Sequence, residues 1–332
     1  MPSSHALRLP EAADVEAAAE RLRGQIVTTP LLESAALNER LGGRLLVKAE
    51  MLQRTGSYKF RGAFNRLSRL DGTERGRGVV AYSSGNHAQG VAAVARALDI
   101  PALIVMPSRA PMVKVEGTRS HGAEVVFYDE ASERREEVAE RLAGERGATL
   151  VRPYEDAEVV AGQGTVGLEL AAQAGAAQAA LDAVLVPCGG GGLVAGTALV
   201  LAKVCPAAEL WAVEPQGFDD TRRSLAAGER LEIAPGAKSF CDALLAPTPG
   251  KLTFALNRRL LAGGLAVDDA TVAAAMRDAF TYLKVVAEPG GAVALAAALS
   301  GAFDCRGKTV AVICSGGNVD PEAFGKVLGE TA

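Results

Sequence analysis

Residues 182–204 read DAVLVPCGGGGLVAGTALVLAKV, which places a strand, a glycine loop and a helix in direct succession. The apolar run at 183–187 is typical of a buried strand, and the alanine-rich run at 193–204 is typical of a helix. Two parallel strands need a crossover connection, and that connection is usually a helix. The stretch therefore predicts an α/β protein with a parallel sheet.

The same alternation continues through most of the chain. Short β-branched runs predict strands at 45–48, 79–82, 102–106, 124–128, 183–187, 210–213 and 309–314. Alanine-rich segments predict helices at 88–98, 132–146, 158–174, 193–204 and 268–284. This order indicates parallel sheets with helices on both faces. Open sheets of this kind bind ligands at the carboxyl ends of their strands, so we expect the functional residues there.

The chain length predicts two domains. Its 332 residues exceed the size at which a single core usually stops growing. The glycine-rich, charged stretch 71–78 and the segment 152–156 are the candidate crossings between domains. We therefore expect a large domain from residues 1–70 and 155–332, and a small mobile α/β domain from residues 71–154.

Composition excludes several classes of partner. The net charge is −4, with one Trp and five Tyr, which speaks against a nucleic-acid surface. No apolar run reaches the ~18 residues that span a bilayer, and no secretory signal is visible. The five cysteines lack CxxC spacing and are expected to be reduced thiols. We expect a cytoplasmic protein without nucleic-acid or membrane partners.

The glycine loop Gly189, Gly190, Gly191 and Gly192 predicts a phosphate site. Glycines let the backbone turn its N–H groups inward without interference from Cβ atoms. The helix that follows presents its positive end to the loop, and such a nest binds phosphate. A tight turn alone would need one glycine, not four. The loop is not a Walker A sequence, because no Gly-Lys-Ser/Thr follows it.

Lys59 is the candidate nucleophile. It lies between Tyr58 and Phe60, near the start of a helix that Ser57 is expected to cap. Aromatic neighbours and a positive helix end favour a neutral amine, which can form a Schiff base. A single lysine of this kind is usually solvated. Here the phosphate loop and two further polar loops after strands, at 83–87 and 314–318, favour a cofactor site.

Five motifs, found in this order between about residues 29 and 320, give the chain a family resemblance. They are SYKFRG at 57–62, SSGNH at 83–87, AGQGT at 161–165, GGGG at 189–192 and SGGN at 315–318. The chain resembles the threonine/serine dehydratase and serine racemase group of fold type II pyridoxal-phosphate (PLP) enzymes. The resemblance implies a two-lobed, three-layer α/β/α fold, like that of the tryptophan synthase β chain, and PLP as the cofactor.

The resemblance also implies roles for individual residues. Lys59 would form the Schiff base, with Tyr58 packed near the cofactor. Asn86 would bind the pyridine 3-hydroxyl, and residues 189–192 would bind the phosphate. Ser315 would face the pyridine nitrogen. A neutral hydroxyl there does not enforce a protonated ring, so elimination is favoured over transamination.

The turn Ser83, Ser84, Gly85, Asn86 and His87 would bind the substrate carboxylate. The implied reaction is dehydration of L-threonine or L-serine to a 2-oxo acid and ammonia, with the freed Lys59 amine removing the Cα proton. In racemases of the group a serine at position 84 faces the other side of Cα. A serine racemase and a 3-hydroxyaspartate dehydratase are therefore the alternatives, and a cofactor-binding protein without turnover is a third.

A metal site is implied after the strand at 210–213. Racemase-like members bind Mg²⁺ or Ca²⁺ with two carboxylates and one carbonyl, which correspond here to Glu214, Asp220 and the carbonyl of Phe218. Oxygen ligands suit a hard divalent cation. The alternative is a pair of solvated turn acids. Arg152, where relatives often have His, leaves the substrate side chain open, and we expect a homodimer or homotetramer.

Overall fold

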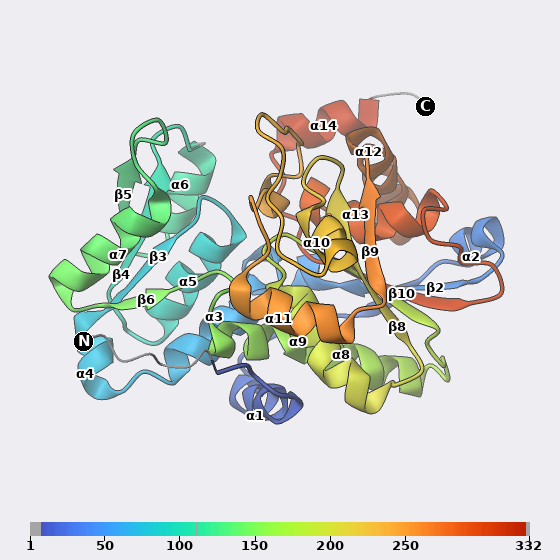
Figure 1. Cartoon of the computed structure of the whole chain (residues 1–332), viewed down its shortest axis with the longest axis horizontal. Coiled ribbons are helices and arrows are strands. Elements are labelled where there is room, and N and C mark those ends of the chain that lie inside the picture. Colours follow the sequence, from blue (N-terminus) through green and yellow to red (C-terminus); the bar gives the residue numbers. More distant parts are fainter. Residues whose placement is uncertain (1–7, 111, 330–332) are drawn as a thin grey trace.

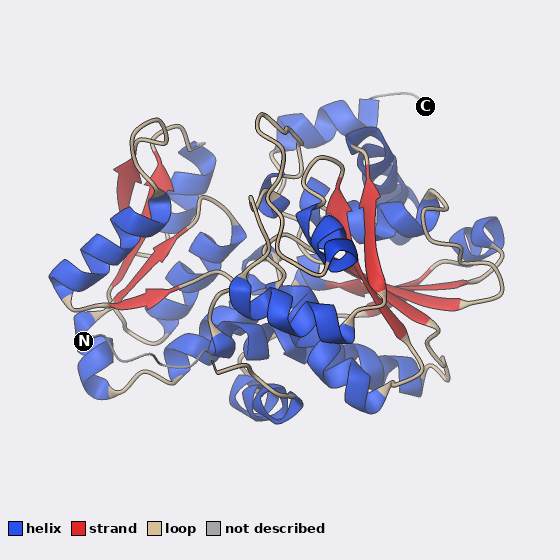
Figure 2. Cartoon of the chain, in the orientation of Figure 1, coloured by secondary structure: helices blue, strands red, loops and turns tan. Residues whose placement is uncertain are grey.

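The structure is a computed structural model that describes residues 8–110 and 112–329, built around two sheets (Figures 1 and 2). The large sheet has the strand order β1-β2-β10-β7-β8-β9. Only β1 is antiparallel to its neighbour among these strands. The bounds are β1 Leu31–Glu33, β2 Arg44–Ala49, β7 Ala183–Pro187, β8 Glu209–Pro215, β9 Gly263–Val267 and β10 Thr309–Cys314.

Helices cover both faces of the large sheet, because successive strand residues point to opposite sides. Val310 and Val312 of β10 pack in one core with α12 and α13, whereas Ala311 and Ile313 pack in another with α8 and α9. The three-layer α/β/α prediction is confirmed. The helices here are α1 Ala12–Leu22, α2 Ala35–Leu41, α3 Lys59–Ser68, α8 Ala157–Ala176, α9 Gly192–Val204, α10 Asp220–Ala227, α11 Lys251–Leu260, α12 Asp269–Asp278, α13 Pro289–Leu299 and α14 Pro321–Gly329.

The small sheet has the parallel strand order β5-β4-β3-β6 and forms the lobe on the left of Figure 1. Its strands are β3 Val79–Tyr82, β4 Ala102–Pro107, β5 Glu124–Tyr128 and β6 Thr149–Val151. Its helices are α4 Gly72–Arg77, α5 Asn86–Ala97, α6 Met112–Arg119 and α7 Arg135–Arg146. All eight lie within the segment predicted for the small domain, whose boundaries remain a prediction.

Helix α3 joins the two lobes, and glycines allow its close contacts. A Cβ on Gly90 of α5 would lie 3.2 Å from the Lys59 carbonyl carbon. A Cβ on Gly162 of α8 would lie 2.7 Å from the Cα of Gly62. The AGQGT motif therefore has a packing role here, since it lets α8 approach α3.

Three short strands were not predicted, and one predicted helix ends early. Strand β9 begins with Gly263 and Gly264, and glycine has a low strand propensity. Glycine is nevertheless required at position 263, because a Cβ there would lie 2.6 Å from the Trp211 ring. The helix predicted at 268–284 ends at Asp278 and continues as a π-helical turn, Ala279–Leu283.

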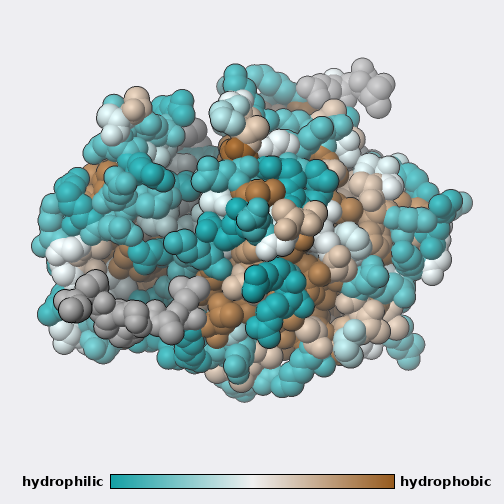
Figure 3. Space-filling view, in the orientation of Figure 1, coloured by the Kyte–Doolittle hydropathy of each residue, from teal (hydrophilic) through white to brown (hydrophobic). Residues whose placement is uncertain are grey.

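Hydrophilic side chains cover much of the face in Figure 3. Among the described residues no helix has the length and apolar character to cross a membrane.

Candidate active site

The loops after the parallel strands meet at one edge of the large sheet, as expected. Strands β2 and β10 are paired from Arg44 and Thr309 to Ala49 and Cys314, so both end at the same level. The loops that follow are bonded together: Tyr58 N donates to Ser315 O at 3.1 Å, and Gly317 N donates to Gly56 O at 2.9 Å. The Lys59 and Ser315 motifs therefore form one unit.

Lys59 is the first residue of α3, and its amine points into a desolvated region. Its Nζ atom lies 3.2 Å from Pro153 O and 5.1 Å from the centre of the Tyr58 ring. Burial lowers the pKa of Lys59 to about 8, although Glu288 acts in the opposite direction. The amine thus loses its proton far more readily than that of an ordinary lysine.

The expectation that Ser57 caps this helix was wrong. The N-cap residue is Tyr58, without a side-chain cap hydrogen bond. Ser57 instead has extended backbone and pairs with Gly316 as an isolated bridge. Its buried Oγ atom has no hydrogen-bond partner, so it remains available to a ligand.

Asn86 links the small lobe to the large lobe. It is the first residue of α5 and is buried. Its Nδ2 atom donates to Glu288 Oε1 at 2.5 Å, and its Oδ1 atom accepts from Asn318 Nδ2 at 2.8 Å. The Asn318 amide also donates to Thr55 O at 2.7 Å. The orientation of the Asn86 amide is therefore fixed from both sides.

Glu288 is a site residue that the sequence analysis missed. It is buried at the N-cap of α13, directly before Pro289. Burial, with the nearby charge of Asp242 as a smaller cause, raises the pKa of Glu288 to about 8. An acid before a proline at a helix start suggests an ordinary cap, and only the lack of a side-chain cap hydrogen bond reveals another role.

Gly189, Gly190 and Gly191 precede α9 and Gly192 is its first residue, so the glycine loop leads into a helix as predicted, and other side chains occupy the space around it. A Cβ on Gly190 would collide with the Tyr154 ring, and one on Gly191, where φ is +88°, would lie 2.8 Å from Asn257 Nδ2. Thr253 Oγ1 donates to Gly190 O at 2.6 Å, whereas both polar side-chain atoms of Asn257 are buried without partners. Thr253 and Asn257, from α11, were not predicted.

The substrate turn at 83–87 follows strand β3 and leads into α5. Gly85 N donates to Ser83 Oγ at 3.2 Å, and the described residues provide no hydrogen bond to the Ser84 hydroxyl. His87 is buried, with Nε2 3.1 Å from Val151 O and Nδ1 without a partner. Burial, and to a lesser degree Lys59, lowers the pKa of His87 to about 3, so its ring is neutral.

Ser315 is buried at the end of β10, as predicted, and two cysteines lie next to the predicted cofactor residues. Burial raises the pKa of Cys314 to about 12 and the pKa of Cys188 well above its usual value. Both thiols therefore stay protonated and are poor nucleophiles.

The predicted metal residues gather where β8 meets α10. Glu214 is buried and accepts from Thr221 N and Arg222 N at 2.9 and 2.8 Å. Asp220 is buried with no partner for Oδ2, and Phe218 is also buried. Burial raises the pKa of Glu214 to about 8, helped by Asp220, and that of Asp220 to about 7. No group of three or more His, Cys, Asp or Glu side chains suited to a metal occurs in the described part of the chain.

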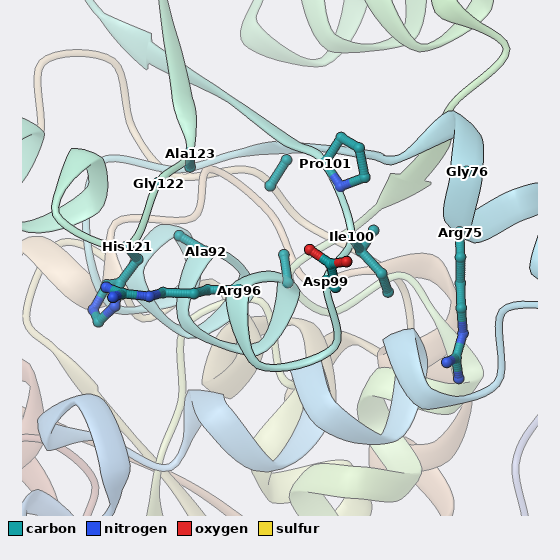
Figure 4. Close-up of a pocket in the computed structure, with 12 residues that line it drawn as sticks. Arg75, Gly76, Ala92, Arg96, Asp99, Ile100, Pro101, His121, Gly122 and Ala123 are labelled. Atoms are coloured by element: carbon teal, nitrogen blue, oxygen red, sulfur yellow. The ribbon is translucent and has the colours of Figure 1, made fainter.

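A pocket of about 550 Å³ lies in the small lobe (Figure 4). Arg75, Arg96, Asp99 and His121 are among its lining residues, and none of the predicted site residues takes part. The Arg75 and Arg96 guanidinium groups already donate to backbone carbonyls, so they do not form a free anion site. The residues predicted from the motifs lie elsewhere, around Lys59.

Comparison with known proteins decides the family. A profile described as "Pyridoxal-phosphate dependent enzyme" matches residues 22–316. The chain belongs to the PLP-dependent enzymes. This PLP-dependent enzyme is 44% identical over 315 residues to an L-threo-3-hydroxyaspartate ammonia-lyase of Pseudomonas sp, covering 95% of this chain and 97% of the relative. It is 38% identical to a serine racemase of Arabidopsis thaliana, covering 92% of each chain.

A solved structure confirms the fold type of this PLP-dependent enzyme. The T.th. threonine deaminase superposes with a TM-score of 0.89 at 43% identity, covering 94% of this chain and 99% of that one. The predicted resemblance to the dehydratase and racemase group is thereby confirmed.

The residues around Lys59 fit PLP. The amine has a lowered pKa, the glycine loop leads into the N-terminus of α9, Ser315 O accepts from Tyr58 N, and Asn86 accepts from Asn318, which lies on the same loop as Ser315. Buried polar atoms without partners occur at Ser57 Oγ and His87 Nδ1, as expected for groups that serve a bound molecule. Lys59 would hold the cofactor, and residues 189–192 would hold its phosphate.

Proposed function

We propose that this enzyme is a PLP-dependent ammonia-lyase that converts a β-hydroxy amino acid, L-threonine or L-serine, into a 2-oxo acid and ammonia. The observation that carries the proposal is the amine of Lys59, which has a pKa near 8 and lies on a loop bonded to the neutral Ser315. The names of the related ammonia-lyases and threonine deaminase support this reaction class.

The chain's own groups perform the acid–base steps. Bound PLP supplies an electron sink for the electrons released at Cα. The neutral Lys59 amine takes the Cα proton, and the amide groups of the 83–87 turn, at the start of α5, bind the substrate carboxylate. The β-hydroxyl leaves as water, and the proton that it gains balances the proton that Lys59 takes from Cα, so that the site returns to its starting protonation state. The unsaturated amine that is released takes up water and yields the 2-oxo acid and ammonia.

3-Hydroxyaspartate is the second candidate substrate, and Arg135 favours it. Arg135 is the first residue of α7 and its guanidinium carbon lies 5.7 Å from the centre of the Tyr82 ring. Tyr82 directly precedes the substrate turn, so a cation lies near that turn. The Arg135 Nε donates to Glu136 at 2.8 Å, which leaves the other guanidinium N–H groups for a second carboxylate. The Pseudomonas relative is named for L-threo-3-hydroxyaspartate.

A panel assay tests the proposal. The PLP-loaded enzyme is incubated with L-serine, L-threonine and L-threo-3-hydroxyaspartate, and the 2-oxo acid, ammonia and D-amino acid are each measured. Equal amounts of 2-oxo acid and ammonia are expected from at least one substrate. Formation of D-amino acid without ammonia would instead identify a racemase, which Ser84 permits. No product of either kind would reject both.

We also propose that Glu214, Asp220 and the Phe218 carbonyl bind Mg²⁺ or Ca²⁺. Two buried carboxylates with raised pKa values, one with an unpartnered oxygen, fit a divalent cation that would remove their repulsion. The cation would stabilise the turn between β8 and α10. We further propose a cytoplasmic homodimer or homotetramer, which light scattering after gel filtration would test.

A further inference from the structure

Glu288 is a buried acid to which the proposed reaction assigns no role. It occupies the N-cap position of α13, where an acidic side chain normally accepts from the first backbone N–H groups of the helix. Its side chain makes no such bond, and Oε1 instead accepts from Asn86 Nδ2 at 2.5 Å. Its backbone N donates to Gly316 O at 3.0 Å. The chain therefore directs this carboxyl group away from its helix and toward the site.

The glycine at position 316 makes room for this arrangement. A Cβ on Gly316 would collide with Glu288 Oε1 and would lie 3.1 Å from Asn86 Nδ2. The SGGN motif thus accommodates Glu288 and Asn86 together, directly after Ser315. The hydrogen bond between Asn86 and Glu288 lies where three separate segments of the chain meet. The fold therefore determines the position of the Glu288 carboxyl group.

Few charged groups offset the negative charge that an ionised Glu288 would carry. The charged groups that face it are Lys59 from α3, Lys114 from α6 and Asp242 from the short 3-10 helix Asp242–Leu244. Lys114 forms an ion pair with Asp242, which reduces the influence of both. Tyr58 and Cys241 also face it, and burial raises the pKa of the phenol and of the thiol, so both stay neutral. The acid lacks a direct cationic partner.

Burial decides the protonation state. It raises the pKa of Glu288 to about 8, with Asp242 adding to the effect and Asn86, Lys114 and Lys59 opposing it. The N-terminus of α13 also favours a charged Glu288, but a helix end changes a pKa by at most about 1.5. This is smaller than the rise from the usual value of 4.5. The acid is neutral in a resting site at neutral pH.

The hydrogen bonds show what a neutral acid does there. Because Asn318 donates to Asn86 Oδ1, the amide of Asn86 must present its NH₂ group to Glu288. That NH₂ group has two hydrogens, and Glu288 accepts only one. The other remains for the cofactor ring, as the proposed function requires of Asn86.

We propose that Glu288 is a positioning residue that carries a proton in the resting site, orients the Asn86 amide, and by ionising changes the charge beside the cofactor. This inference rests on the proposed function. When Glu288 loses its proton, a negative charge arises next to Asn86 and within range of Lys59. It strengthens the bond from Asn86 and favours a positive charge at Lys59.

The test follows the visible absorption of the PLP-loaded enzyme between about pH 6 and about pH 10, on either side of the midpoint. Wild type should show a one-proton step with a midpoint near 8. Glu288→Gln keeps the size of the side chain but cannot ionise, so the step should vanish. Glu288→Asp should retain a step at a different midpoint. Glu322→Gln, at an exposed position on α14, is the matched control and should leave the wild-type step unchanged.

A step with the same midpoint in Glu288→Gln would overturn the proposal. If that variant does not fold, identical midpoints in wild type and Glu288→Asp would overturn it equally. A wild type without any step would do the same. None of these outcomes affects the proposed function, because the visible band itself shows bound PLP. Absence of the band from wild type would contradict the proposed function instead.

Discussion

Lys59 and Arg61 lie on the same first turn of α3, yet the two side chains have very different surroundings. Arg61 is fully buried, and donates to both oxygens of Glu50 at 2.7 and 2.8 Å and to Glu169 Oε1 at 2.8 Å. Lys48 Nζ donates to Glu169 Oε2 at 2.7 Å. These four residues form the structural network. Burial alone would lower the pKa of Arg61, but Glu50 and Glu169 outweigh it and raise the pKa.

The site cluster consists of Lys59, Asn86 and Glu288. Asn86 and Glu288 are buried and Lys59 is partly buried, and the cluster lacks such compensation. The Lys59 amine contacts a carbonyl instead of a carboxylate, and its pKa is lowered to about 8. Glu288 contacts an amide instead of a cation, and its pKa is raised to about 8. Charges that are fully paired give a rigid structure, whereas incompletely paired groups can exchange protons near neutral pH. The contrast predicts that variants of the two clusters fail in different ways.

Lys59→Met should give the largest functional loss. It removes the amine that would hold PLP and take the Cα proton, so 2-oxo acid formation should fall by at least about 10²–10⁴-fold. The visible band of the covalently held cofactor should disappear, while the folded protein persists. Lys203→Met, at an exposed ion pair on α9, is the control. A retained band in Lys59→Met would contradict the assignment.

The same variant should change how stability depends on pH in the cofactor-free protein. Since the pKa of Lys59 is lowered from 10.5 to about 8, the unfolded chain binds more protons than the folded chain between these pH values. Stability should therefore rise with pH across this window and be lost again as pH falls toward 8. Lys59→Met should remove this part of the rise, as urea unfolding at several pH values would measure. An identical profile in both proteins would reject the lowered pKa.

Arg61→Met should instead give the largest loss of stability. It leaves Glu50 and Glu169 buried without their main partner, which typically costs about 3–5 kcal/mol. Urea unfolding would measure the loss. The fraction of Arg61→Met that remains folded should still show the visible band of the bound cofactor. Arg306→Met, which removes an exposed ion pair, should cost less than about 1 kcal/mol. Equal losses in the two variants would show that the network adds nothing.

Glu214 and Asp220 resemble the site cluster more than the structural network, since burial raises the pKa of both carboxyl groups and the charge of Arg223 opposes the rise at Asp220 only in part. Mg²⁺ at 100 times its Kd should stabilise the protein by about 2.7 kcal/mol, visible as a higher Tm that EDTA reverses. Asp220→Asn should raise the Tm in EDTA and abolish the response to Mg²⁺. An unchanged Tm in wild type with EDTA and with added Mg²⁺ or Ca²⁺ would reject the metal site.

Sequence patterns predicted the central strands of both sheets well, because strands buried on both faces are continuous β-branched runs. The sequence did not predict strand β9 because Gly263 obtains its packing from Trp211 and Gly264 from Arg222, and both partners are distant in sequence. The helix predicted at 132–146 begins only at Arg135, since residues before it form a turn held by Asp129. Such boundaries depend on local hydrogen bonds that periodicity does not reveal.

For the site, motifs after strand ends led to Lys59, Asn86 and the glycine loop, which the structure places at the starts of α3, α5 and α9; their roles stay predictions. Glu288 and Asn257 could not be predicted in the same way. Each lies on a helix whose local sequence is ordinary, and each becomes notable only because folding leaves it buried without a usual partner. Burial and partnership are tertiary properties, so the sequence of one segment does not contain them.

Ser84 offers the finest test, because it separates two reactions of one site. In the structure it lies on the substrate turn, partly buried, two residues before Asn86 of the site cluster. Elimination from an L-substrate needs only the Lys59 amine and a proton for the leaving hydroxyl. Racemisation needs a second proton donor on the opposite face of Cα. A serine hydroxyl is a poor acid, and the described residues offer it no hydrogen bond, so any contribution should be small in elimination. Ser84→Ala should therefore abolish D-amino acid formation from L-serine while 2-oxo acid formation falls less than about tenfold, as chiral chromatography and a ketoacid assay on the same samples would measure.

Ser83→Ala is the matched control for Ser84→Ala. The Ser83 hydroxyl shapes the turn by accepting from Gly85 N, so its loss should affect both reactions equally. If Ser84→Ala reduces both reactions to the same extent, Ser84 shapes the turn as Ser83 does, and the racemase alternative loses its support.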